Sequence, residues 1–201
     1  MTKWLGVLAQ KGGTGKSTIT VHLAVEAERN GERVLVLDAD PQASSLAWGQ
    51  NRDAETPRVE RLQDGVKNVS VGDATLVVVD FPPRASAAVA VLAEQLDYAI
   101  VPLQPSSFDM ATVDTTARIL RAARVKYAVV LNRAPERSID VGNAREYLDG
   151  LEVEYAPVAI GDRRAFVRAL MSGESVSEFE PRGRAAEEIA NLWAFVKGNL
   201  K

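Results

Sequence analysis

The chain has 201 residues, of which 46% are hydrophobic, so it is long enough for one domain with a substantial core and too short for two ordinary domains. Its 27 acidic and 24 basic residues give a net charge of -3, and this balance does not by itself indicate nucleic acid or an anionic membrane as a partner. The absence of cysteine excludes disulfides, thiolate metal sites and cysteine-ligated iron–sulfur clusters. We therefore expect residues 1–201 to form a single domain of a cytoplasmic protein.

Short apolar runs alternate with longer helical patterns along the whole chain, which is typical of βαβ units. This alternation predicts an α/β fold, a doubly wound and mostly parallel sheet with helices on both faces. The expected strands cover residues 4–9, 33–38, 76–80, 99–102, 127–132 and 154–160. The expected helices cover residues 17–30, 84–96, 109–125, 138–149, 162–171 and 183–200. Because glycine tolerates the left-handed conformation of a helix end, Gly31 and Gly150 are expected to close the helices before them.

Two further features of the pattern concern structure more than chemistry. The segment from Pro41 to Thr75 is polar and weakly periodic, and the sequence predicts only a short helix around Trp48 within it. His22, the only histidine, lies near apolar positions of the first expected helix, so we expect a packed helix residue without a chemical role.

A glycine-rich segment follows the first expected strand directly and leads into the first expected helix. Its glycines let the backbone curl with the N–H groups pointing inward, and the helix N-terminus favours negative charge. Lys16 can reach the outer phosphates of a nucleotide, and the Ser17 hydroxyl can join a Mg²⁺ shell. This context predicts a phosphate-binding loop, formed by Lys11, Gly12, Gly13, Thr14, Gly15, Lys16, Ser17 and Thr18.

The loop departs from the ordinary pattern at its first position, where Gln10 replaces a glycine and Lys11 follows. The sequence KGGTGKST resembles the deviant Walker box of the ParA/MinD superfamily, in which the additional lysine is the signature lysine, here Lys11. The chain is most similar to the small, ParF-like partition ATPases that lack an N-terminal DNA-binding domain. The resemblance implies a Mg²⁺-dependent ATPase of slow intrinsic turnover, with Lys11 and Lys16 as catalytic lysines.

Three later segments extend the resemblance. DADPQ, which closes the second expected strand, is similar to the A′ motif and implies that Asp40 organises the attacking water. LVVVD is similar to a Walker B strand and implies that Asp80, together with Ser17, holds Mg²⁺ and its waters. VVLNR is similar to the strand whose asparagine reads the adenine edge, here Asn132. The alternatives are a strand-ending turn at Asp-Pro, a helix cap at Asp80 and a turn asparagine.

The resemblance also implies partners. Two subunits enclose ATP and Mg²⁺, the ATP-bound homodimer binds nonspecific DNA, and a ParB-like or other adaptor protein stimulates hydrolysis. Such a switch segregates or positions plasmid or chromosomal DNA, or another cargo, and is associated with the nucleoid. Arg163, Arg164 and Arg168 lie on one expected helix and suit phosphate contacts without sequence readout, whereas a solvated helix face is the alternative.

Two other classes of function remain as alternatives, a MinD-like membrane-associated positioning ATPase and a metabolic ATP-dependent enzyme. The last expected helix carries Ile189, Leu192, Trp193 and Val196 at helical spacing, which favours a core-facing stripe over a membrane anchor. We therefore expect no stable membrane association. Binding to anionic liposomes would favour the first alternative, and ATP consumption that rises with a metabolite would favour the second.

Overall fold

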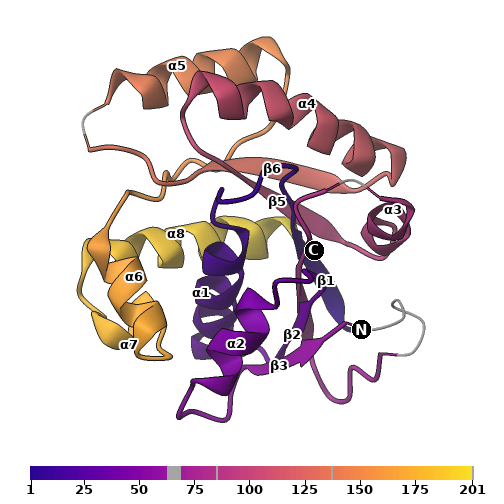
Figure 1. The fold of residues 1–201 in the computed structure, drawn as a ribbon, viewed down its shortest axis with the longest axis vertical. Coiled ribbons are helices and arrows are strands. Elements are labelled where there is room, and N and C mark those ends of the chain that lie inside the picture. Colours follow the sequence, from indigo (N-terminus) through magenta and orange to yellow (C-terminus); the bar gives the residue numbers. More distant parts are fainter. Residues whose placement is uncertain (63–68, 85, 137, 201) are drawn as a thin grey trace.

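A parallel sheet forms the centre of the computed structural model, which describes residues 1–62, 69–84, 86–136 and 138–200 and, within them, all side chains except those of residues 107–111. The described part of the sheet has six strands in the order β3-β2-β4-β1-β5-β6, and every neighbouring pair is parallel (Figure 1). These strands are β1 (Lys3–Val7), β2 (Val34–Asp38), β3 (Arg58–Arg61), β4 (Leu76–Asp80), β5 (Tyr98–Leu103) and β6 (Lys126–Leu131). The predicted α/β class and parallel sheet are confirmed.

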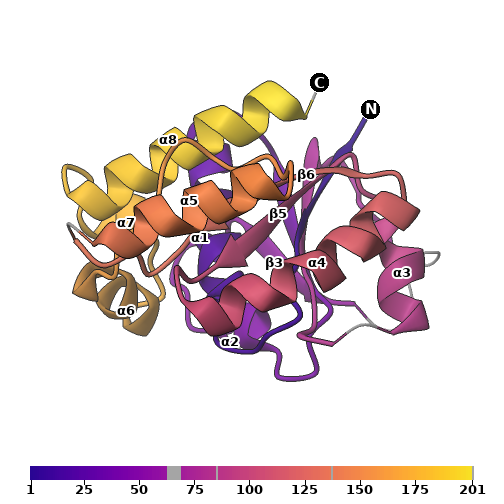
Figure 2. The same cartoon turned by 90° about the horizontal axis from the view of Figure 1, so that it is seen from above.

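Helices cover both faces of the sheet (Figures 1 and 2). One core cluster joins the sheet to α1, α6, α7 and α8, and a second cluster joins the opposite face to α3, α4 and α5. The helices are α1 (Lys16–Arg29), α2 (Ser44–Gln50), α3 (Ala87–Ala93), α4 (Ser107–Ala122), α5 (Ile139–Gly150), α6 (Arg164–Met171), α7 (Val176–Phe179) and α8 (Arg184–Asn199). The doubly wound arrangement is that predicted from the alternation of strands and helices.

The inner strands β2 and β4 are apolar up to their terminal aspartates, and both of their faces are covered. Leu76 and Val78 of β4 pack in the cluster with α1 and α8, whereas Val77 and Val79 pack in the cluster with α3 and α4. Successive side chains of a strand point to opposite faces, so a strand covered twice needs no polar alternation. The apolar stripe of α8 is buried as predicted, at Ile189, Leu192, Trp193 and Val196.

One prediction about strands was wrong, and one strand was not predicted. Within residues 154–160 only Tyr155 makes an isolated bridge to β6, at Val129, and a second bridge joins Gly161 to Ala134 beyond the end of β6. Pro157 lacks the N–H that a continuous ladder requires. The edge strand β3 lies instead in the polar segment whose structure the sequence left open.

Of the two glycines expected to close helices, Gly31 closes α1 with a φ of 92°, but Gly150 is still part of α5, as its last residue. Among the described helices, none combines the length and the apolar character that crossing a membrane requires.

His22 lies in α1 and is fully buried. Its Nδ1 accepts the backbone N–H of Val176 at 3.2 Å, and its ring meets Phe166 edge-on with the centroids 5.1 Å apart. Burial lowers the pKa of His22 to about 3, although the negative charge of Glu178 acts in the opposite direction. The neutral imidazole therefore packs α1 against α6 and α7, in agreement with the expected packing role.

This burial predicts a pH dependence of stability. Unfolded His22 takes up a proton near its ordinary pKa of about 6.5, whereas the folded state keeps the ring neutral. The stability that His22 contributes is therefore complete above that value and is lost as the pH falls toward about 3. Between about pH 7.5 and about pH 5, this group should lower the free energy of unfolding by about 2 kcal/mol.

Urea unfolding at the two pH values measures the effect, with His22→Asn as the matched variant. The asparagine oxygen replaces Nδ1 as an acceptor and does not titrate, so the variant should lack this component of the pH dependence whatever its absolute stability. The same decrease in both proteins would show that His22 does not cause it.

Candidate functional site

The carboxyl ends of three neighbouring strands meet at one edge of the sheet and define the site. Asp80, the last residue of β4, lies in register with Val7 of β1 on one side and with Asp38 of β2 on the other. Open parallel sheets bind ligands beyond the carboxyl ends of their strands. The glycine-rich loop after β1 and the acidic residues of β2 and β4 therefore face a common space.

Side-chain amides of the residues directly after β5 and β6 hold the glycine-rich loop. The Nδ2 of Asn132 donates a 2.6 Å hydrogen bond to the Thr14 carbonyl oxygen, and the Nε2 of Gln104 donates one of 3.0 Å to the Gly13 carbonyl oxygen. Gly13 and Gly15 have φ values of 80° and 94°, a conformation that glycine adopts without the steric cost of a Cβ. The loop is thus held in shape by contacts with strands distant in sequence.

The hydrogen bond to Thr14 adds a role to Asn132 that the sequence did not suggest. The residue is only 4% exposed, and it lines a cavity of about 340 Å³ together with Arg133 and Phe166. The predicted contact with the adenine edge stays a prediction. The observed contact shows that Asn132 also fixes the loop on which the phosphates are expected to bind.

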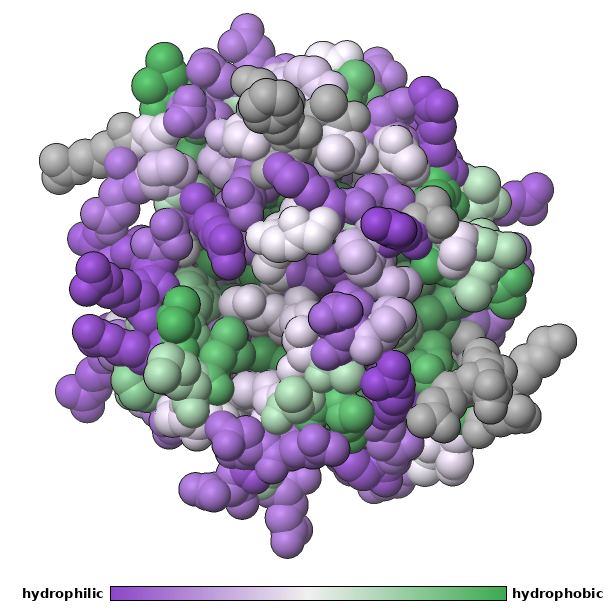
Figure 3. Space-filling model, viewed as in Figure 1, coloured by the Kyte–Doolittle hydropathy of each residue, from purple (hydrophilic) through white to green (hydrophobic). Residues whose placement is uncertain are grey.

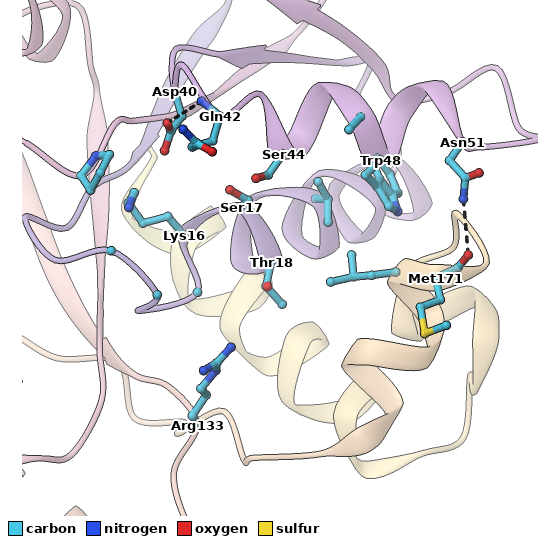
Figure 4. Close-up of a pocket in the computed structure, with 17 residues that line it drawn as sticks. Lys16, Ser17, Thr18, Asp40, Gln42, Ser44, Trp48, Asn51, Arg133 and Met171 are labelled. Atoms are coloured by element: carbon cyan, nitrogen blue, oxygen red, sulfur yellow. Dashed lines mark hydrogen bonds between the residues drawn. The ribbon is translucent and has the colours of Figure 1, made fainter.

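A larger cavity of about 580 Å³ opens beside the loop, and its size is suitable for a nucleotide. Figure 4 shows Lys16 and Asp40 at one end of this cavity, and Trp48 and Met171 at the other. Thr18, near the start of α1, lines both this cavity and the smaller one. Six of the eight predicted loop residues therefore line one space together with Asp40, whereas Lys11 and Thr14 do not line it.

The two lysines of the loop have different surroundings. Lys16 is 6% exposed, and burial lowers the pKa of its ammonium group, whereas the negative charges of Asp80 and Asp40 favour the protonated form. A buried charge is tolerated when opposite charges lie beside it. Lys11, by contrast, is exposed. Of the two lysines, Lys16 is the one that lines the large cavity beside the acidic residues.

Asp80 is fully buried, and burial raises its pKa to about 6 although hydrogen bonds from Ser17 and Ser45 lower it. The Ser45 hydroxyl donates to Asp80 Oδ2 at 2.7 Å. The second oxygen, Oδ1, is buried and has no hydrogen-bond partner within the described part of the chain. Such an oxygen suits Mg²⁺, which binds one or two carboxylates and completes its shell with hydroxyl, phosphate and water oxygens. Ser17 and Asp80 therefore fit the expected Mg²⁺ site.

The acidic loop after β2 is fixed by backbone N–H groups. The Asp38 carboxylate accepts from Asp40 N at 3.0 Å and from Leu46 N at 2.9 Å, and these bonds oppose the rise in its pKa that burial causes. Asp40 accepts from Gln42 N at 3.0 Å and lines the large cavity. The structure thus gives Asp38 a structural role and places Asp40 where a water could be oriented beside a phosphate.

The three arginines expected to contact DNA differ in availability. The Arg163 guanidinium pairs with Glu188 at 2.7 Å and with Glu136 at 2.8 Å, and its side chain is only 20% exposed. Because these carboxylates already neutralise it, the geometry does not support the expectation that Arg163 binds DNA. Arg164 and Arg168 are exposed on α6.

The exposed face of α6 combines these arginines with apolar side chains. Val167 and Met171 are 61% and 77% exposed, and their spacing from Arg164 and Arg168 places all four on one side of the helix. Figure 3 shows apolar side chains beside strongly hydrophilic ones over α6. Met171 also lines the large cavity, so this face adjoins the mouth of the site.

Residues 5–176 match the family described as CobQ/CobB/MinD/ParA nucleotide binding domain. The chain belongs to this family. It is a P-loop ATPase of the ParA/MinD type, and it uses ATP and Mg²⁺. The recognition based on the deviant Walker box is therefore confirmed.

Two relatives of the family with the name maintenance of carboxysome distribution protein A match almost the whole chain. The protein of Gloeobacter kilaueensis is 32% identical over 94% of this chain and 94% of its own length. The protein of Halothiobacillus neapolitanus is 30% identical over 93% of this chain and 92% of its own length.

Solved structures of the family share the fold. Apo McdA of Cyanothece superposes with a TM-score of 0.79 at 16% identity, and the alignment covers 100% of both chains. The septum site-determining protein MinD of Pyrococcus horikoshii, complexed with Mg-ADP, superposes with a TM-score of 0.77 at 18% identity and covers 98% of this chain and 96% of its own. At these identities the likeness concerns the fold alone.

Sequence reasoning missed three residues of this family member's site. Gln104, which holds the loop, could have been found because it follows a strand at the carboxyl edge of the sheet. Arg133 lines both cavities and has a φ of 50°, and its position directly after the expected strand and Asn132 is the signal that could have identified it. No sequence signal identifies Ser45, since a serine in the first turn of a helix is ordinary.

The geometry of the loop predicts the effect of Gly15→Ala. An alanine Cβ would clash with Asn132 Nδ2, and the φ of 94° disfavours any side chain by about 1–2 kcal/mol. Nucleotide affinity should therefore fall by about 10-fold or more. Binding of a fluorescent ATP analogue measures the loss, with Gly142→Ala in α5 as a control because its Cβ meets no atom within 4 Å. Unchanged affinity in the Gly15 variant would contradict this account of the loop.

Proposed function

We propose that this ATPase positions a large cargo inside the cell by switching between an ATP-bound dimer and a separated state. The separation of the two loop lysines carries the proposal, because Lys16 is buried beside acidic residues whereas Lys11 is exposed. One P-loop lysine is enough to contact the outer phosphates within a subunit. A second lysine that faces outward suits the nucleotide of an opposing subunit related by a two-fold axis.

The proposed reaction depends mainly on positioning and on charge stabilisation, as phosphoryl transfer requires. Lys16 and the loop N–H groups bind the phosphates, Ser17 and Asp80 hold Mg²⁺, and Asp40 orients the attacking water. Mg²⁺, when bound, neutralises charge that develops on the phosphates. Turnover in an isolated subunit is slow because Lys11 of the second subunit has to complete the charge stabilisation.

The cargo is inferred from relatives. Two relatives that match more than nine-tenths of the chain at 30% identity or more are named for carboxysome distribution, which supports a microcompartment such as a carboxysome as the cargo. Plasmid or chromosomal DNA is the alternative, because a relative named protein ParA also matches 97% of the chain, at 27% identity. A separate adaptor protein, in the role of a ParB-like protein, connects the cargo to the ATPase and stimulates hydrolysis.

We expect the proposed dimer to bind the DNA of the nucleoid. Arg164 and Arg168 are exposed and contact phosphates without reading bases. In α8 the apolar stripe is buried in the core, and this supports DNA over a membrane as the working surface.

Lys11→Ala tests the dimer. The variant should bind ATP, because Lys16 and the loop amides remain, but it should fail to form the ATP-dependent dimer and should lose hydrolysis. Lys16→Ala should instead weaken nucleotide binding itself. Light scattering after size exclusion with ATP and Mg²⁺, beside a nucleotide titration on the same samples, separates the two effects. Dimerisation and hydrolysis at the parental level in Lys11→Ala would remove the main support for the proposal.

Charge reversal on α6 tests DNA binding. Each lost phosphate contact reduces the slope of log affinity against log salt by about one, so Arg164→Glu combined with Arg168→Glu should reduce it by about two. Arg121→Glu is the matched control, since Arg121 is exposed on α4, away from α6 (Figure 1). Binding of random-sequence duplex DNA with ATP and with ADP is measured across a salt series. Equal affinity in both nucleotides, or an unchanged slope in the double variant, contradicts the DNA surface.

A further inference from the structure

Two consecutive serines at the start of α2 face different parts of the molecule. Ser44 is exposed and points into the large cavity (Figure 4), whereas Ser45 is fully buried. The Ser45 hydroxyl donates to Asp80 Oδ2 at 2.7 Å, although the two residues are 35 positions apart. A buried serine in the first turn of a helix is thus directed at the carboxylate of the Mg²⁺ site.

The acidic loop determines where Ser45 lies. Ala43, just before α2, has a φ of 52°, which turns the chain back toward the sheet. The Asp38 carboxylate accepts hydrogen bonds from the backbone on both sides of this turn, at Asp40 N and at Leu46 N. The position of Ser45 is therefore fixed by the same loop that carries Asp40.

The hydrogen bond makes the two oxygens of Asp80 unequal. Oδ2 accepts from Ser45, whereas Oδ1 is buried and has no hydrogen-bond partner among the described residues. A donor on one oxygen fixes the rotation of the carboxylate plane and favours its ionised form. The unpartnered oxygen is consequently held in one direction at the carboxyl end of β4, which lies beside the end of β1 that leads into the glycine-rich loop.

We infer that Ser45 is a positioning residue of the Mg²⁺ site. Its hydroxyl orients the Asp80 carboxylate so that Oδ1 stays available to bind the ion. Ser45 does not contact the nucleotide and acts only through Asp80. The inference rests on the assignment of Asp80 to the Mg²⁺ shell. It also connects the two acidic segments of the site, because the loop that presents Asp40 supplies the hydroxyl that orients Asp80.

Residues that orient metal ligands change metal affinity or activity by about 10-fold to 100-fold when they are removed. Ser45→Ala should therefore weaken Mn²⁺ binding to the ADP-bound protein by about 10-fold or more. Electron paramagnetic resonance of free Mn²⁺ gives this affinity directly and does not depend on hydrolysis. ADP binding in excess EDTA should remain at the parental level, and hydrolysis should require more Mg²⁺.

Ser177→Ala is the matched control. Its hydroxyl is buried and donates to Glu26 Oε2 at 2.6 Å, near the opposite end of α1 from the loop. Both variants remove a buried serine–carboxylate hydrogen bond, so both should lose stability, but only the Ser45 variant should lose Mn²⁺ affinity. Equal Mn²⁺ affinity in Ser45→Ala and Ser177→Ala would show that Ser45 is structural only and would overturn the inference.

Ser45→Cys keeps the experiment decisive if the alanine variant does not fold. A thiol is close in size and a weaker donor, so its Mn²⁺ affinity should be below that of the parent. Parental affinity in Ser45→Cys overturns the inference. Asp80→Asn tests the assignment beneath it, since parental Mn²⁺ affinity in that variant refutes the Mg²⁺ site itself. Loss of affinity in Asp80→Asn without loss in either Ser45 variant refutes only the role of Ser45.

Discussion

A carboxylate buried at the end of β4 is the constraint on which the rest of the site depends. Asp80 lies between β1 and β2 with no exposed surface, and burial, the largest cause, raises its pKa to about 6 although hydrogen bonds from Ser17 and Ser45 act in the opposite direction. Lys16 is buried nearby, and for this group burial lowers the pKa. An isolated charge in such a place is costly, and removing one partner leaves the other uncompensated. The fold therefore keeps the lysine, the carboxylate and the hydroxyl groups of Ser17 and Ser45 together before any ligand is considered.

Helix α2, which follows the acidic loop, connects the acidic residues to the opposite side of the cavity. Trp48 of α2 donates from Nε1 to the Glu174 carbonyl oxygen at 3.3 Å. Directly after α2, Arg52 lies over the Trp48 ring at 4.9 Å and pairs with Glu178 through hydrogen bonds of 2.6 Å and 2.9 Å. The Arg52 side chain is almost completely buried, so removing Glu178 would leave an uncompensated charge and would destabilise the fold. Helix α2 and the residues directly after it, which follow the loop that carries Asp40, are thus joined by direct contacts to α7 and to the segment between α6 and α7.

The sequence by itself determined the fold class and most of the phosphate site, because both depend on local patterns. Continuous apolar runs between helical segments require a sheet covered on two faces, and this is what the two core clusters show. The glycine spacing around Lys16 predicts a loop that curls around phosphate, and the family match confirms a nucleotide-binding domain. Strand ends were also informative, since Asp80 and Asn132 follow apolar runs and both reach the carboxyl edge of the sheet.

Only the tertiary structure decided which of these groups form hydrogen bonds or ion pairs, and with which residues. Arg163 and Glu188 are 25 positions apart, and their pairing, which neutralises Arg163, depends on how α8 packs in the fold. The 118-residue separation between Thr14 and Asn132, and the turn that directs Ser45 at Asp80, are equally invisible to local patterns. Hydrogen bonds and ion pairs tolerate changes of only a few tenths of an ångström in the distance between donor and acceptor. The packing of the whole sheet sets these distances, so the residue types predict the chemistry of the site but not which residues pair.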